Sequence, residues 1–296
     1  MTFRAVPTLF SLVLSVAAVA GERGVDAARD AAVAADGHGY LAPGSWVVTE
    51  TRVRSDGTAV TEKRKLAIVP GGGDARAVQE SRWAADGFEP AGPARPVGGV
   101  IGRAFEQVCP KPDGVRPDRV VTVGPKRYVC RVETYTLRDE AGGRTTTLTL
   151  LRDKTGETRL PPRTVSIHGA AIPLPIDALE AEIATEGPGV STKSRRVVSA
   201  IASPLRVNGQ TLTCLVETTE TCGTEGGKEI QLGVREWTSH DVPGEPLRRV
   251  TCGTIGGAEV QSELNVIDFH VARPATPSGA TAGGAGGMPT IVPSAE

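Results

Sequence analysis

The 296-residue sequence predicts an all-β protein built mainly from antiparallel strands. Apolar and polar side chains alternate in several segments, for example at residues 229–235, which buries one face of a strand and leaves the other wet. Two dipeptides, Asp56-Gly57 and Asn208-Gly209, favour tight hairpin turns between such segments. The chain also has 36 glycines and 22 prolines but only 4% aromatic residues. We expect a curved sheet, half-barrel or sandwich made from a duplicated β-meander unit.

The N-terminus has the features of an export signal. Arg4 precedes an apolar run over residues 8–20, which ends in the small-x-small pattern Ala18-Val19-Ala20. The run is too short for a stable membrane span, so we predict a signal peptide at residues 1–20, cleaved between Ala20 and Gly21. A retained N-terminal anchor is the alternative. Residues 21–43 are rich in Ala, Asp and Gly and are predicted to be a linker.

Residues 44–175 are interpreted as a first β unit. Its opening strands are expected at residues 46–53 and 65–69, on either side of Asp56-Gly57. Residues 85–118 contain 12 Gly or Pro in 34 positions, and strands tolerate neither residue well. We therefore expect a long irregular excursion there.

Residues 176–272 are interpreted as a second β unit that begins with one short helix, near residues 176–185. Ile176, Leu179 and Ile183 have helical spacing, and Asp177 with Glu180 resembles a capping box. Beyond this unit, the segment 273–296 is dominated by Gly, Pro, Ala, Ser and Thr, so we predict a disordered tail.

The two units share a pattern at a spacing of 84 residues. Residues 130–134 (CRVET) recur as residues 214–218 (CLVET), and Gly142-Gly143 recurs as Gly226-Gly227. Glu133 and Glu217 occupy matching positions and could be read as a carboxylate pair for acid–base chemistry. We expect instead that each faces solvent, opposite a neighbouring buried Val. Coincidence in a biased composition is the alternative to duplication.

The number of cysteines is odd, so at least one thiol is free or pairs outside the chain. One reading is that Cys130 and Cys214 are buried strand thiols that pack as small apolar groups. The other reading is one disulfide in each unit. It would join Cys109 to Cys130, and Cys214 to either Cys222 or Cys252.

A motif of unknown role brings Ser, His and Asp together near a strand end. Consecutive side chains on an extended chain point in alternating directions, so we expect a turn rather than a catalytic triad. We predict no catalytic residue, no metal site and no cofactor, and the net charge of −1 indicates neither nucleic acid nor an anionic membrane as a partner. The motif comprises Trp237, Ser239, His240, Asp241, Val242 and Pro243.

Residues 205–252 resemble a family of uncharacterised secreted bacterial β-rich proteins with the pattern V-x-G-x-x-x-x-C … W-x-S-x-x-V-P. The pattern is matched here by Val207, Gly209, Cys214 and residues 237–243. This family is in turn distantly similar to the periplasmic lipoprotein-carrier type of fold, which implies a curved antiparallel sheet able to cradle acyl chains. The first unit departs from the pattern, because Asp153 stands where Trp237 would align.

Three functional hypotheses follow. The first is an exported, non-enzymatic β-domain in the periplasm or secreted, with a cell-envelope structural or interaction role and an envelope protein as partner. The second is a carrier that holds an apolar, lipid-like small molecule on a concave sheet face. The third is a hydrolase, for which the sequence offers no constellation of residues. No membrane span is expected after removal of the signal peptide.

Overall fold

The computed structural model describes residues 42–272 except 56–57, 72–75, 97–104, 106–108, 110, 141, 162, 240 and 243–245. The predicted signal peptide, linker and tail, including Ala20 and Gly21, therefore lie outside the described residues, apart from the ends at residues 42–43. All the elements described in this part of the chain are strands. They are β1 (Trp46–Ser55), β2 (Thr58–Pro70), β3 (Arg76–Ala84), β4 (Gly87–Pro90), β5 (Arg95–Pro96), β6 (Gly114–Val123), β7 (Lys126–Asp139), β8 (Arg144–Asp153), β9 (Arg163–Ile167), β10 (Ala170–Leu174), β11 (Ala178–Gly187), β12 (Val190–Val207), β13 (Gln210–Glu225), β14 (Lys228–Thr238), β15 (Arg248–Ile255) and β16 (Ala258–His270).

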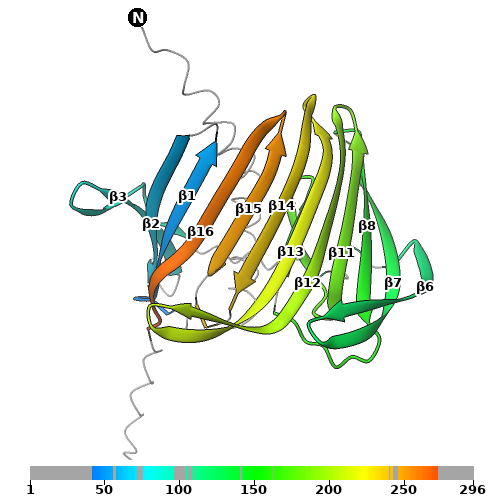
Figure 1. The fold of residues 1–296 in the computed structure, drawn as a ribbon, viewed down its shortest axis with the longest axis horizontal. Helices are drawn as coiled ribbons and strands as arrows, with labels where there is room; N and C mark the ends of the chain where they lie inside the picture. Colours follow the sequence, from blue (N-terminus) through cyan, green and yellow to red (C-terminus); the bar gives the residue numbers. More distant parts are fainter. Residues whose placement is uncertain are drawn as a thin grey trace, which may run out of the picture.

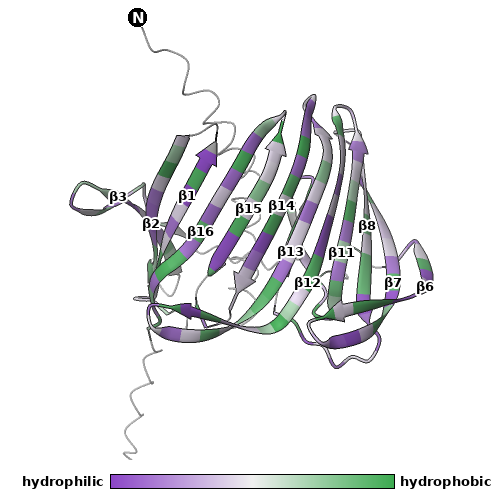
Figure 2. Ribbon diagram, in the orientation of Figure 1, coloured by the Kyte–Doolittle hydropathy of each residue, from purple (hydrophilic) through white to green (hydrophobic). Residues whose placement is uncertain are grey.

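Fourteen of these strands form a single large antiparallel sheet (Figure 1). Its order is β4-β3-β2-β1-β16-β15-β14-β13-β12-β11-β8-β7-β6, and β5 pairs with β3. Strands β9 and β10 form a separate two-stranded sheet. Figure 2 shows hydrophilic and hydrophobic residues alternating along β14 and β16, the pattern from which antiparallel strands were predicted. The predicted all-β, mainly antiparallel class is confirmed.

Both predicted tight turns join paired strands. Asn208 has φ 44° and Gly209 has φ 79°, and Val207 lies opposite Gln210. Two successive positive φ values are those of a type I′ turn, which Asn-Gly adopts readily because neither residue is strongly penalised there. Asp56 and Gly57 lie outside the described residues, but Ser55 and Thr58 on either side of them are opposite each other in the ladder.

The short helix expected near residues 176–185 is wrong, because this segment forms β11. It pairs with β8 on one side and β12 on the other, and the register shifts around Leu179. Asp177 accepts a hydrogen bond from Arg152 at 2.9 Å. Glu180 accepts two from Arg195, at 2.7 and 2.9 Å. Helix propensity is a weak preference that two flanking strands and two ion pairs override.

Segment 85–118 is less irregular than expected where it is described. It includes the short strands β4 and β5 and the beginning of β6. Its strand prolines lie where a sheet tolerates them. Pro117, for example, lies on the outermost strand β6, where the register shifts between Arg116 and Arg119.

Two consecutive hairpins repeat each other closely, which the sequence reasoning missed. Residues 221–230 (TCGTEGGKEI) and 251–260 (TCGTIGGAEV) are identical at seven of ten positions. They form the hairpins β13–β14 and β15–β16 in the same register. In each hairpin a strand glycine, Gly223 (φ 139°) or Gly253 (φ 148°), lets the backbone of the neighbouring strand approach. A Cβ there would collide with the carbonyl oxygen of Ser191 or Gln231.

The long strand β12 extends beyond β11 and helps to create two further cores. Its outer part lies against β6, and the Gly124 amide donates to the Ser199 carbonyl at 3.1 Å. The tip of the β12–β13 hairpin reaches β16, where Asn208 Nδ2 donates to Asp268 Oδ1 at 2.7 Å. One core lies near β6 and β12, and includes Val121, Cys130, Leu151 and Val198. The other lies near β1, β13 and β16, and includes Val47, Cys214, Leu247 and Val266.

Candidate functional site

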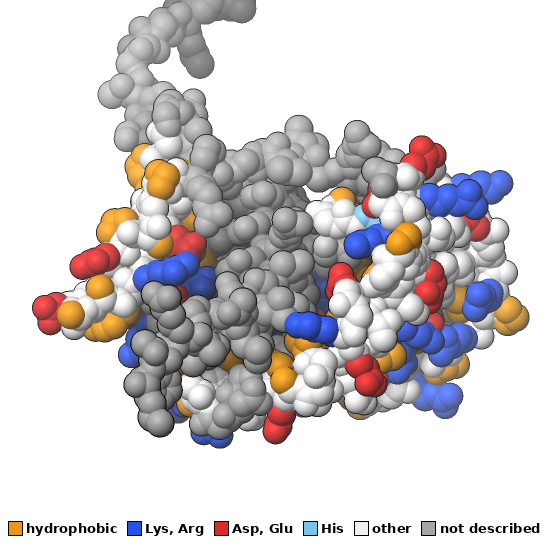
Figure 3. Space-filling model, turned by 90° about the horizontal axis from the view of Figure 1, so that it is seen from above, with side chains coloured by type: hydrophobic (Ala, Val, Ile, Leu, Met, Phe, Trp, Pro, Cys, Tyr) orange, Lys and Arg blue, Asp and Glu red, His pale blue; other side chains and the backbone are white. Residues whose placement is uncertain are grey.

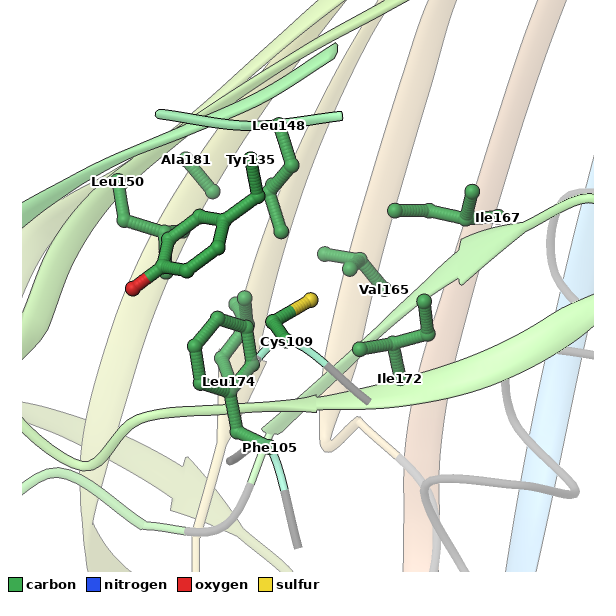
Figure 4. Close-up of a cluster of buried hydrophobic side chains, with 10 residues drawn as sticks. All are labelled: Phe105, Cys109, Tyr135, Leu148, Leu150, Val165, Ile167, Ile172, Leu174 and Ala181. Atoms are coloured by element: carbon green, nitrogen blue, oxygen red, sulfur yellow. The ribbon is translucent and has the colours of Figure 1, made fainter. Parts of the chain in front are cut away.

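The β9–β10 hairpin packs on one face of the sheet through apolar side chains. Figure 4 shows its side chains directed toward those of β7, β8 and β11, with Phe105 and Cys109 beside them. Phe105 meets Tyr135 edge-on, with ring centroids 5.2 Å apart. The buried members of this cluster are Phe105, Cys109, Tyr135, Leu148, Leu150, Val165, Ile167, Ile172, Leu174 and Ala181.

A buried ion cluster ties the start of this hairpin to the sheet. Arg163 Nη1 at the beginning of β9 donates to Glu217 Oε1 on β13 at 2.8 Å, and Arg163 Nη2 donates to the Ala178 carbonyl. Arg196 on β12 donates to both oxygens of Glu217, at 3.0 and 2.5 Å, and to the Thr164 carbonyl at 2.8 Å. Only 2% of the Glu217 side chain and 6% of the Arg163 side chain are exposed. We call Arg163, Arg196 and Glu217 the hairpin anchor.

The hairpin anchor keeps its carboxylate ionised. Burial by itself would raise the pKa of Glu217, but the charges of Arg196 and Arg163 and their hydrogen bonds outweigh it and lower that pKa. Glu236 lies at the margin, 3.8 Å from Arg196, and is also paired with Arg249 at 2.5 Å. The anchor is thus continued across the sheet by a second ion pair.

Glu133 belongs to a separate cluster on β7 and β8. It pairs with Arg131 at 3.0 Å and with Arg152 at 3.2 Å, and it accepts a hydrogen bond from the Tyr135 hydroxyl at 2.8 Å. Burial, then this contact with Glu133, raises the pKa of Tyr135. Asp177 completes the cluster by pairing with Arg152 at 2.9 Å.

The expectation that Glu133 and Glu217 face solvent is wrong, since their exposed fractions are 8% and 2%. They do not approach each other either. Four strand-to-strand steps separate β7 from β13, or about 19 Å along the sheet at about 4.8 Å per step. The paired carboxylates of glycoside hydrolases stand about 5–10 Å apart. The arrangement therefore gives two independent ion clusters rather than one acid–base pair.

The Trp237 motif divides between a packed part and a turn. Trp237 is the last residue but one of β14, and the guanidinium groups of Arg235 and Arg248 lie 4.9 and 5.2 Å from its ring. Val242 is buried in the core near β1, β13 and β16. Ser239 Oγ donates to Asp241 Oδ2 at 3.4 Å. His240 and Pro243 lie outside the described residues.

None of the candidate disulfides is present, and all five cysteines are free. Cys109 and Cys130 are buried in different cores. Cys214 and Cys222 are eight residues apart on β13, or about 27 Å at about 3.4 Å per residue. Cys252 lies on β15, two strands from β13, so it is about 10 Å or more from either of them. A disulfide requires Cα atoms within about 7 Å.

The alternative reading of the cysteines, as buried strand thiols, describes Cys130 and Cys214. Both are fully buried, and each sulfur lies 3.9 Å from the carbonyl oxygen two residues earlier, that of Tyr128 or Leu212. Burial, together with Asp153 for Cys130 and Asp241 for Cys214, raises the pKa of each thiol to about 11. Cys222 and Cys252 are exposed.

Within the described part of the chain, no three His, Cys, Asp or Glu side chains gather closely enough to hold a metal ion. No helix among those same residues is long and apolar enough to cross a membrane.

Comparisons with known proteins find only remote structural likeness. No family model matches the chain, and no curated protein matches it. A protein assigned as exported, with a YmcC-like fold, from Bacteroides fragilis is 8% identical, with a TM-score of 0.30 over 77% of this chain and 96% of that one. MucB bound to the periplasmic part of MucA is 10% identical, with a TM-score of 0.16 over 83% of this chain and 92% of that one. The Pseudomonas aeruginosa MucA/MucB complex gives 11% identity and a TM-score of 0.13 over the same shares. TM-scores this low transfer no function.

Proposed function

We propose that this protein is an exported, non-enzymatic β-sheet protein with a structural or interaction role in the cell envelope. The observation that carries the proposal is the hairpin anchor. A general acid needs a raised carboxyl pKa and access to a substrate, whereas Glu217 is enclosed and its pKa is lowered by two arginines. Its chemistry is that of a structural ion pair that fixes a hairpin on a sheet.

Export is supported by the N-terminal sequence, with cleavage after Ala20 and a mature chain in the periplasm or outside the cell. Free thiols are compatible with an oxidising compartment when burial keeps them from reacting, and three of the five are buried. The geometry of the exposed pair, Cys222 and Cys252, prevents them from joining each other.

The proposal includes an internal duplication of the sheet. β6 ends at Val123 and β12 at Val207, and β8 begins at Arg144 and β14 at Lys228, so both boundaries recur after 84 residues. The matching thiols, Cys130 and Cys214, make the same contact with a carbonyl two residues earlier. In this account the β6–β7 and β12–β13 hairpins are equivalent arms of one sheet.

The alternative function is that of a carrier for a lipid-like molecule. Its attraction is the apolar surface that Tyr135, Leu148 and Leu150 present on one face of the sheet. The β9–β10 hairpin occupies that surface with Val165, Ile167, Ile172 and Leu174. Within the described residues, therefore, the side chains of the protein itself fill the place that an acyl chain would take.

Native mass spectrometry of the protein purified from cell envelopes separates the two functions. The proposal expects the mass of the bare chain, or of the chain with a protein partner. Lipid retained at one molecule per chain contradicts the proposal and favours the carrier. The same chain without residues 1–20, purified from the cytoplasm, is the control for lipid acquired during extraction.

A further inference from the structure

The β6–β7 arm has an exposed apolar surface for which the equivalent β12–β13 arm has no counterpart. The exposed fractions of Val115, Val120 and Val129 are 72%, 51% and 47%. In the β12–β13 arm, the positions 84 residues later than Val120 and Val129 are Pro204 and Thr213. The valines are therefore not a requirement of the arm as a fold.

The register places these valines on one face. Val120 lies opposite Val129, and Val115 lies opposite Glu133. Opposite residues of an antiparallel ladder share a face, as do alternate residues of one strand. Arg127, Val129 and Arg131 of β7 therefore share a face with Val115 and Val120 of β6. We call these five residues the valine stripe.

The arm carries cations that its acidic residues do not neutralise. Lys126 pairs with Glu157, Lys154 with Asp118, and Arg119 with Glu182. Arg131 of the stripe pairs with Glu133 and Asp177 but remains 43% exposed. Arg127 makes no ion pair with another described residue, and it is exposed at the end of the stripe.

We propose that the valine stripe is a docking surface for an extended, acidic segment of an exported partner protein. This rests on the proposed interaction role, and charge complementarity selects the partner. Along β7 the stripe presents a cation, an apolar group and a cation at every second residue. An extended partner with the order acidic-x-apolar-x-acidic repeats at the same spacing of about 6.8 Å, so its side chains meet all three.

The test uses full-length mature protein and a fluorescein-labelled peptide of sequence (Glu-Thr-Val-Thr)₃-Glu. Its matched control has Lys in place of each Glu. We expect the acidic peptide to bind at least about tenfold more tightly than the lysine peptide in anisotropy titrations, and to weaken as salt is raised. Equal binding of the two peptides overturns the proposal.

The variant R127T/V120T/V129T removes one cation and two exposed apolar groups with little change in volume. We expect it to bind the acidic peptide about tenfold more weakly while keeping the circular dichroism and melting temperature of the parent. The control variant T213V, on the equivalent arm, should bind like the parent. Unchanged binding by the triple variant overturns the proposal.

Two further measurements identify a different occupant. If vesicles containing phosphatidylglycerol bind the parent but not the triple variant, and the acidic peptide binds neither, the stripe is a membrane-binding surface and the proposal fails. If sedimentation shows a dimer that the triple variant abolishes, a second copy of this chain occupies the stripe and the proposal fails. The non-enzymatic role proposed above survives both of these outcomes.

Discussion

The substitution Glu217→Gln tests the hairpin anchor most severely. It leaves the Arg163 guanidinium, whose side chain is 6% exposed, with the Ala178 carbonyl as a hydrogen-bond partner but without an anionic one. Removing one partner of a buried ion pair costs about 3–5 kcal/mol, because the remaining charge is left uncompensated. Since Glu217 is paired with both Arg163 and Arg196, we expect the upper part of that range. The total stability of a domain is only about 5–15 kcal/mol.

Urea unfolding followed by circular dichroism measures the loss. We expect the midpoint to fall steeply with little change in the slope of free energy against urea. Glu220→Gln, an exposed change on the same strand, is the matched control and should cost less than about 0.5 kcal/mol. A cost below about 1 kcal/mol for Glu217→Gln would refute the structural role assigned to the cluster.

The pH dependence of the same variant has a definite sign. The pKa of Glu217 is lower in the folded protein, so its carboxylate stabilises the fold above the unfolded pKa of about 4.3. That contribution is lost as the pH falls through the folded pKa. The difference in stability between the parent and Glu217→Gln should therefore be constant near pH 7 and shrink below about pH 4. A difference that persists at pH 2 contradicts the assignment.

Three other changes have defined outcomes. Gly223→Ala and Gly253→Ala should each destabilise the fold by more than about 2 kcal/mol in urea melts, since a Cβ there meets backbone, whereas Gly114→Ala, which has open space, should cost less than about 1 kcal/mol; similar effects at all three positions would contradict the repeated close approach. In thiol titration at pH 7.5, Cys222 and Cys252 should react in the folded protein and all five thiols in denaturant, because burial raises the pKa of Cys130 and Cys214 to about 11; five fast thiols, or fewer than five in total, would count against the described cores. Asp153→Ala should cost about 2–3 kcal/mol, because this carboxylate accepts hydrogen bonds from the backbone amides and hydroxyls of Thr155 and Thr158; an unchanged melting temperature would show that this turn is unimportant.

Sequence reasoning succeeded where the signal is local. Asn208-Gly209 specifies its own backbone conformation, so the hairpin between β12 and β13 could be predicted from two residues. It failed at residues 176–185, where Leu179 and Glu180 have helix propensity but both flanking strands are supplied by distant segments. β-structure is decided by such non-local pairing more than by local preference.

The candidate site was missed for the same reason. Glu217 was expected to face solvent, yet its partners come from β12 and from Arg163, 54 residues earlier in the chain. No local pattern announces that contact. In contrast, the repeated hairpins at residues 221–230 and 251–260 were available from the sequence by comparing it with itself at a spacing of 30 residues. The 84-residue comparison alone did not show them.

The central claim is that the chain is exported and acts there without a bound small molecule. The most direct measurement is the native mass of the protein recovered from the periplasmic fraction after expression with its own first 20 residues. We predict the mass of residues 21–296, free of lipid. Recovery of the chain with Met1 in the cytoplasm, or of a stoichiometric lipid complex in the periplasm, would contradict the account.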